Sequence, residues 1–140
     1  MHIPIASVNS ENVPTITPIG SLFLNDNQTG FYFAKFAIKL NQNSKINKNV
    51  CLLAVKTGKL FWLKSLFKGS FSEYPAVKIY GVLGEKREAT PKEFRDFQRR
   101  VRSTKMLKGH QYLWENMSMI REITFTKAEK INLGNMTKYL

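Results

Sequence analysis

The chain has 140 residues, of which 43% are hydrophobic, and its formal net charge at pH 7 is +12. A chain of this size and composition buries a core without disulfides or metals, so we expect one folded domain over residues 1–140 rather than disorder. Cys51 is the only cysteine, which excludes an internal disulfide or a cysteine-built metal site and predicts a reducing, cytoplasmic compartment. Residues 1–10 do not match a signal peptide, and no stretch approaches the ~20 apolar residues of a membrane span.

The positive charge is spread along the chain, because each half carries a net charge of +6. Between Asp26 and Glu73, however, the sequence has eight lysines and no acid. Such a stretch creates a field that favours an anion, whether a phosphate ester, a nucleic acid or a membrane surface. A solvated cationic face that only keeps the protein soluble explains the same pattern.

The first two-thirds of the chain is predicted to be β, because β-branched and aromatic residues recur there between turn signals. Pro18 removes a hydrogen-bond donor from the run Pro14–Leu24, which predicts an edge position or a bulge. The apolar run Val50–Val55 is expected to be buried on both faces. The strand candidates are Ile5–Val8, Pro14–Leu24, Phe31–Ala34, Val50–Val55, Leu60–Phe67, Ala76–Leu83 and Met119–Thr126.

Two helices are predicted. A short one is expected within Lys39–Asn49, and the clearest begins at Thr90, where Thr90-Pro91-Lys92-Glu93 combines a capping box with a proline at the first helical position. The connections between the strands are too short for the crossovers of a parallel sheet. We therefore predict a mainly β fold, a small six-stranded antiparallel barrel with peripheral helices.

Most catalytic signatures are absent, including G-x-S-x-G, H-E-x-x-H, the Walker A loop and G-x-G-x-x-G, which argues against a hydrolase, a zinc protease or a nucleoside triphosphatase. His110 is predicted to be a loop residue rather than a catalytic base, because no partner is evident. Cys51 lies in an apolar strand and is expected to be a core residue rather than a nucleophile. No catalytic residue and no metal ligand are therefore assigned.

The remaining chemistry is a set of hydroxyl, amide and ammonium groups around the first hairpin and the segment after it. Groups of this kind bind a phosphate dianion through charge-assisted hydrogen bonds. The set consists of Thr15, Thr17, Ser21, Lys35, Lys39, Asn43, Ser44 and Lys45.

The order of the elements also carries information. An opening strand Ile5-Ala6-Ser7-Val8 is followed by Val13–Gly20, Phe31-Tyr32-Phe33-Ala34, and Ser44–Asn49 leading into Val50–Val55; Leu113–Met117, Arg121–Phe125 and Ile131–Thr137 close the chain. This series resembles the FMN-binding split barrel of the pyridoxamine 5′-phosphate oxidase-like flavoproteins, in which Ser-Lys begins a helix. The resemblance implies that FMN lies at the interface of a homodimer.

The resemblance also implies roles for individual residues. Thr17, Pro18, Ile19 and Gly20 would lie along the flavin ring, Ala34 and Lys35 beside the ribityl chain and phosphate, and Ser44 and Lys45 at the phosphate. Lys39 would compensate for the arginine that the founding oxidases carry in the place of Thr17. Trp114 and Arg121 would reach the flavin of the opposite subunit.

The preferred interpretation is an FMN-dependent oxidoreductase with an unknown substrate at the open ring face, near Trp62, Phe67 or Trp114. A flavin performs redox chemistry itself, so few acid–base residues are required. Two alternatives stay open. One is a nucleic-acid-binding barrel in which Phe31, Tyr32, Phe33 and Phe36 stack on bases, and the other is a cofactor-free split-barrel dimer.

Overall fold

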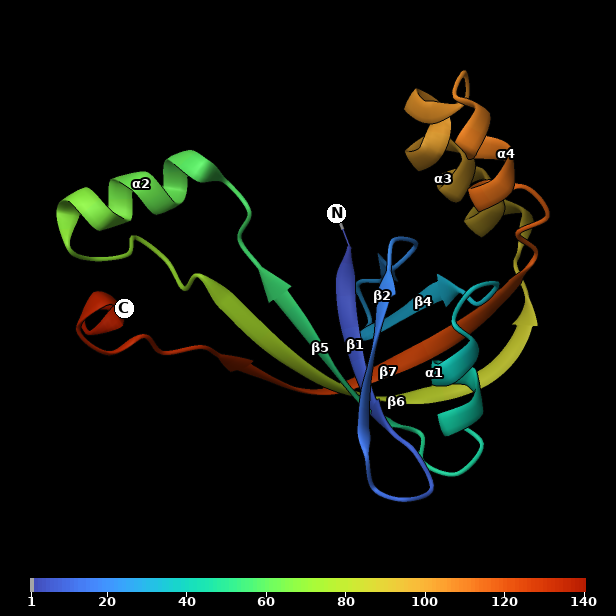
Figure 1. Cartoon of the computed structure of the whole chain (residues 1–140), viewed down its shortest axis with the longest axis horizontal. Helices are drawn as coiled ribbons and strands as arrows, with labels where there is room; N and C mark the ends of the chain where they lie inside the picture. Colours follow the sequence, from blue (N-terminus) through green and yellow to red (C-terminus); the bar gives the residue numbers. More distant parts are fainter. Residues whose placement is uncertain (1) are drawn as a thin grey trace.

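The computed structural model describes residues 2–140 and contains one antiparallel sheet of seven strands, in the order β2-β1-β5-β6-β7-β4-β3 (Figure 1). The strands are β1 (Ile3–Val8), β2 (Pro14–Ile19), β3 (Phe23–Leu24), β4 (Thr29–Phe33), β5 (Asn49–Val55), β6 (Ala76–Glu88) and β7 (Met119–Lys130). The fold is mainly β and antiparallel, as predicted. It has seven strands rather than six, and no hydrogen-bonded pairing of β2 with β3 closes the sheet in residues 2–140.

The helices lie around the sheet. They are α1 (Ile38–Asn43), α2 (Lys59–Lys68), α3 (Pro91–Val101) and α4 (Lys108–Trp114), with 3-10 turns at Arg102–Thr104 and Gly134–Thr137. Figure 1 shows α2 and the C-terminal segment on an arm that extends from the barrel, while α3 and α4 lie at the opposite end and α1 lies against the barrel. None of the described helices has the length and apolar character needed to span a membrane.

The predicted strand Pro14–Leu24 is two strands, at opposite edges of the sheet. Only Gly20-Ser21-Leu22 joins them, so the sheet curls until its two edges approach each other. Ser21 holds this corner, since its buried hydroxyl accepts a hydrogen bond from the amide of Phe33 at 3.1 Å and donates to the carbonyl of Phe33 at 3.4 Å. Pro18 lies on an edge strand, as expected, and the β1–β2 register has no bulge there.

Two groups of apolar side chains form the core. The larger one fills the barrel, with Ile5, Leu52 and Ile123 fully buried, and the smaller one packs under α3 around Phe97 and Ile120. The expectation that Val50–Val55 is buried on both faces is only partly correct. Leu52 is buried, but Cys51, Leu53 and Ala54 are half-buried and Val55 is exposed, because the end of β5 leaves the barrel for the arm.

The predicted strand Leu60–Phe67 is wrong, since these residues belong to α2. Their buried or half-buried side chains are Phe61, Trp62 and Ser65, at helical spacing, and the two aromatic rings pack on Phe71. Gly69 ends the helix in the left-handed conformation at φ 69°, which favours glycine. A short apolar run without strict alternation does not by itself distinguish a strand from a helix.

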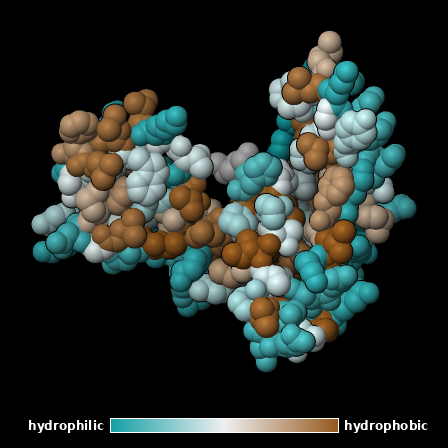
Figure 2. Space-filling view, in the orientation of Figure 1, coloured by the Kyte–Doolittle hydropathy of each residue, from teal (hydrophilic) through white to brown (hydrophobic). Residues whose placement is uncertain are grey.

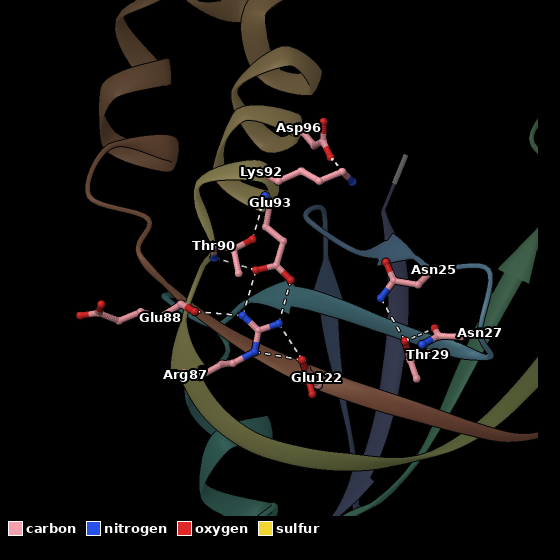
Figure 3. A network of polar contacts seen from close by, with 10 residues as sticks. All are labelled: Asn25, Asn27, Thr29, Arg87, Glu88, Thr90, Lys92, Glu93, Asp96 and Glu122. Carbon is pink, nitrogen blue, oxygen red and sulfur yellow. Dashed lines mark hydrogen bonds and ion pairs between the residues drawn. The ribbon is translucent and has the colours of Figure 1, made fainter.

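The two predicted helices are present as α1 and α3, whereas α4 was not predicted. Thr90 caps α3, where its hydroxyl accepts from the amide of Glu93 and the Glu93 carboxylate accepts from the amide of Thr90. The same carboxylate accepts two hydrogen bonds from Arg87, which also bonds Glu122 (Figure 3). These bonds from Arg87 hold the pKa of Glu93 at about 2, although partial burial opposes the shift. The network ties α3 to β6 and β7.

Candidate functional site

A cavity of about 460 Å³ lies between α1 and the neighbouring ends of β6 and β7, and we call it the cationic cavity. Its volume suits a small-molecule ligand. Four of its side chains are cations, and no Asp or Glu lines it. The lining residues are Ala34, Lys35, Ile38, Asn41, Gln42, Lys45, Lys86, Asn116, Ser118, Met119 and Arg121.

Arg121 is the decisive residue of this cavity. It lies on β7 between Tyr32 of β4 and Lys86 of β6, and only 7% of it is exposed. Its Nη1 donates to the Ser44 hydroxyl at 2.6 Å, whereas its Nε is buried without a hydrogen-bond partner. No carboxylate within residues 2–140 lies at ion-pair distance from it. Because a buried charge without a counterion is costly, an anion bound in the cavity would relieve that cost.

Ser44 lies behind Arg121 and does not line the cavity. Its hydroxyl donates to the carbonyl of Asn41 at 2.9 Å and accepts from Arg121, so both of its main bonding directions are used within the protein. The expectation that Ser44 and Lys45 begin a helix is wrong, because Ser44 is the C-cap of α1. Ser44 and Lys45 therefore present no helix N-terminus to a phosphate. The cations of the cavity are the side chains of Lys35, Lys45, Lys86 and Arg121.

The wall contributed by α1 also contains an unused acceptor. The Asn41 amide nitrogen donates to the carbonyl of Ala34 at 3.0 Å, but its Oδ1 is buried without a partner. Lys35, in the segment before α1, donates to the carbonyl of Glu115 at 2.6 Å. The cationic cavity therefore combines charged donors with one acceptor that suits a ligand hydroxyl.

Other predicted phosphate ligands have structural roles instead. The buried Asn43 amide donates to the hydroxyls of Ser7 at 2.9 Å and Thr15 at 2.8 Å, which attaches α1 to β1 and β2. Ser21 holds the corner between β2 and β3 through Phe33. These polar groups position the cavity wall but do not line the cavity.

The remaining predicted site residues lie elsewhere. Pro18, Ile19, Gly20 and Trp114 line a separate corner cavity of about 400 Å³, together with His2, Ser21, Phe33, Phe36, Ala37, Leu113 and Met117. Thr17 is half-buried on β2 and Lys39 is exposed on α1, and neither lines either cavity. The predicted residues that do line a cavity are thus divided between two cavities, which lie on either side of the chain segment from Phe33 to Ile38.

Lys86 is the main residue that sequence analysis missed. It lies directly opposite Arg121 in the β6–β7 ladder, so the signal was in the strand register and not in any motif. Two predicted substrate neighbours, Trp62 and Phe67, lie on the α2 arm and line neither cavity.

Two further expectations concern reactive groups. His110 lies in α4 and not in a loop, and its Nδ1 is 3.1 Å from the Thr104 hydroxyl. No group of three or more His, Cys, Asp or Glu residues is placed to hold a metal ion in the part of the chain that the structure describes.

Solved structures with the same architecture are known. An FMN-binding protein from Syntrophomonas wolfei matches with a TM-score of 0.64 and 14% identity, over 94% of this chain and 77% of that one. A candidate pyridoxamine 5′-phosphate oxidase from Lactobacillus delbrueckii matches with a TM-score of 0.55 and 15% identity, over 91% and 83%. The chain has the pyridoxamine 5′-phosphate oxidase-like split-barrel fold.

Other proteins with this split-barrel fold have different ligands in their names. The heme storage protein of Vibrio cholerae matches with a TM-score of 0.59 and 9% identity, over 92% of this chain and 84% of that one. No protein-family model and no curated protein matches the sequence. The split-barrel fold alone therefore does not select a ligand, and the chemistry of the cationic cavity has to do so.

Proposed function

We propose that the protein is an FMN-binding flavoprotein whose cationic cavity holds the phosphate of FMN. The observation that carries the proposal is the buried Arg121 guanidinium, which has one hydroxyl partner, a free Nε and no carboxylate at ion-pair distance in residues 2–140. A phosphate dianion accepts bidentate hydrogen bonds from a guanidinium and neutralises its charge.

The other groups of the cavity fit the same ligand. Lys35, Lys45 and Lys86 add positive charge around Arg121. The free Oδ1 of Asn41 suits a hydroxyl of the ribityl chain, whereas heme carries no alcohol hydroxyl. Contacts with the flavin ring are proposed from the resemblance, through Pro18–Gly20 of the corner cavity. The resemblance assigns Trp114 to the flavin of the opposite subunit, and Trp114 lines the corner cavity of its own chain.

Bound FMN would supply hydride and electron transfer. The chain itself would bind the phosphate, orient the cofactor and exclude water from it. This division of work agrees with the small number of acid–base groups in the two cavities, and we propose an oxidoreductase role with an unknown substrate.

We further propose that the protein is a homodimer, as the resemblance implies. The arm of Figure 1 presents apolar residues to solvent, which Figure 2 shows as a brown area over α2. Leu60, Leu63, Leu66 and Phe67 are between 52% and 86% exposed. Such a cluster on one helix is larger than scattered surface residues and is typical of an interface. Light scattering on a size-exclusion column measures the mass, and a monomer would contradict this part of the proposal.

The nucleic-acid alternative loses its stacking surface in the structure. Phe31, Tyr32 and Phe33 are at most 4% exposed, because they fill the barrel and the core under α3. Phe36 alone of the four expected aromatic residues is exposed. One exposed ring together with a net positive charge supports phosphate binding better than base stacking.

The test is a titration of the cofactor-free protein with FMN and with riboflavin, which lacks the phosphate. The change in flavin fluorescence measures binding in both titrations. We expect FMN to bind at least ~100-fold more tightly, as the loss of charge-assisted bonds to Arg121 predicts. Equal affinities would overturn the phosphate assignment. Failure to retain FMN would favour the cofactor-free dimer, and tighter binding of hemin than of FMN would favour a heme protein.

A further inference from the structure

A third cavity, of about 700 Å³, lies where the β2–β3 corner faces the end of α3, and we call it the Arg100 cavity. Most of its wall is apolar and includes Ile3, Ile19, Leu22, Leu24, Val101 and Trp114. Its polar side chains are His2, Arg100 and Thr104, and none of its lining residues is acidic. A large apolar wall with one permanent cation is an amphipathic site.

Arg100 is held in place at the wall of this cavity. Its Nη1 donates to the backbone carbonyl of Leu22, and its guanidinium carbon lies 3.5 Å from the centre of the Phe23 ring. Partial burial lowers the pKa of Arg100, yet the group keeps its charge. No ion pair of Arg100 is present within residues 2–140. A fixed cation without a counterion is preorganised for an anion, because little side-chain entropy is lost when the anion binds.

The neighbouring Arg99 is an ordinary surface arginine on the same helix and serves as a comparison. Its side chain is 81% exposed and lies 3.8 Å from Asp96, one turn earlier on α3. It lines none of the three cavities. Being basic and near the end of α3 is therefore not enough to place a side chain in this cavity, and Arg100 is there because of its own contacts.

We propose that the Arg100 cavity binds an amphipathic monocarboxylate, with its carboxylate on Arg100 and its apolar part against Leu22, Leu24 and Trp114. One guanidinium satisfies one carboxylate through two parallel hydrogen bonds. A phosphate dianion would need more cations than this wall provides. The apolar wall favours a ligand whose remaining surface is hydrocarbon.

The place of the cavity also connects it with the proposed chemistry. It shares His2, Ile19, Gly20 and Trp114 with the corner cavity, where the flavin ring is proposed to lie. A carboxylate ligand here would be a substrate candidate, and that role rests on the proposed FMN function. Binding of the ligand does not rest on it, and binding is what the experiment measures.

The experiment uses isothermal titration calorimetry on the cofactor-free full chain with octanoate and with octanamide, its neutral counterpart. Phenylpropionate is a second carboxylate, and its comparison with octanoate shows whether the cavity prefers an aromatic ring or a linear alkyl chain. We expect octanoate or phenylpropionate to bind the wild type at least ~10-fold more tightly than octanamide. The Arg100→Gln variant should lose that preference, and the matched Arg99→Gln variant should keep it.

Several results would overturn the proposal: no carboxylate binding to the wild type, equal binding of octanoate and octanamide, or equal loss in both variants. If Arg100→Gln does not fold, the Arg100→Lys variant keeps the charge but loses the bidentate geometry, and an unchanged preference there would also contradict the proposal. FMN affinity of the Arg100→Gln variant separates the two hypotheses. The FMN affinity of this variant should be unchanged. A failure of carboxylate binding would therefore not contradict the proposal that the cationic cavity binds the phosphate of FMN.

Discussion

Two arginines on adjacent strands, Arg87 of β6 and Arg121 of β7, are placed in opposite electrostatic environments. Arg87 bonds the carboxylates of Glu93 and Glu122 and the carbonyl of Glu88 (Figure 3). Arg121 bonds one hydroxyl and is more deeply buried. The pairing of Arg87 contributes to the fold, whereas the unpaired charge of Arg121 is retained at a cost to the fold. Such a residue is a candidate for ligand binding.

The sequence around the two arginines does not reveal this difference. Each is followed directly by a glutamate, Glu88 or Glu122. Adjacent residues in a strand point to opposite faces, so neither glutamate pairs with the arginine before it through its side chain. Glu122 instead reaches Arg87 across the β6–β7 ladder. The register of two strands, and not local sequence, decides which arginine is neutralised.

The largest expected effect comes from removing the unpaired charge. Arg121→Met should weaken FMN binding by about 3 kcal/mol, roughly 100-fold, because charge-assisted bonds to the phosphate are lost. The free energy of unfolding of the cofactor-free variant, from urea denaturation, should be unchanged or higher, since a buried unpaired cation is gone. Riboflavin affinity serves as the internal control.

The different roles of Arg121 and Arg87 would be contradicted if Arg121→Met strongly lowered the free energy of unfolding while the FMN and riboflavin affinities fell together. That outcome would make Arg121 a structural residue like Arg87, with the Ser44 hydroxyl as its essential partner.

The second effect is the converse substitution. Arg87→Met should destabilise the protein by about 2 kcal/mol, since Glu93 and Glu122 lose their cation and α3 loses its attachment to the sheet. The FMN affinity of the folded fraction should stay within a factor of about 2. Urea denaturation and an FMN titration on the same preparation give both numbers, and a loss of affinity as large as that of Arg121→Met would contradict the division of roles.

The start of α3 shows what local sequence predicts well. The four residues from Thr90 to Glu93 contain the capping hydroxyl, the proline and the reciprocal carboxylate, so their geometry depends on no distant contact. The corner between β2 and β3 shows the opposite. It depends on the bond from Ser21 to Phe33, twelve residues away, and on the curl of a whole sheet, so the run Pro14–Leu24 was indistinguishable from one strand.

The candidate site follows the same rule. Lys35 and Lys45 were predicted together and do share a cavity, because the order of the elements carried them. Arg121 was expected at the flavin of the opposite subunit, but it lines the same cavity as these two lysines of its own chain. Lys86 was missed since only the β6–β7 register places it opposite Arg121. The hydroxyl of Ser44 was expected at the phosphate, but the end of α1 turns it toward Arg121.

The third effect is the pH dependence of the stability that the ion pair between Arg87 and Glu93 provides. The pKa of Glu93 is held at about 2, below its ordinary 4.5, mainly by hydrogen bonds from Arg87. A carboxyl with a lowered folded pKa stabilises the protein above pH 4.5, and this contribution is lost as pH falls from 4.5 toward 2. Glu93→Gln should therefore cost about 1.5 kcal/mol at neutral pH, after allowance for solvent screening, and almost nothing near pH 2.

The measurement is urea denaturation of the wild type and the Glu93→Gln variant at several pH values. Glu88→Gln is the matched control, because the Glu88 side chain points away from Arg87 in Figure 3. A difference between wild type and Glu93→Gln that stayed constant from pH 7 to pH 2 would show that the ion pair is not its source.

The smallest expected effect tests the lysines that surround Arg121. Lys45 lines the cationic cavity and is exposed, so its attraction to a phosphate is screened by water and salt. Lys45→Gln should weaken FMN binding only about 3-fold at low ionic strength and less at high ionic strength, because an exposed charge pair contributes roughly 0.2–1 kcal/mol. Lys64→Gln, on the α2 arm outside the cavity, should leave the affinity unchanged. Equal effects of the two substitutions would mean that the net charge of the whole protein, and not the cationic cavity, attracts the phosphate.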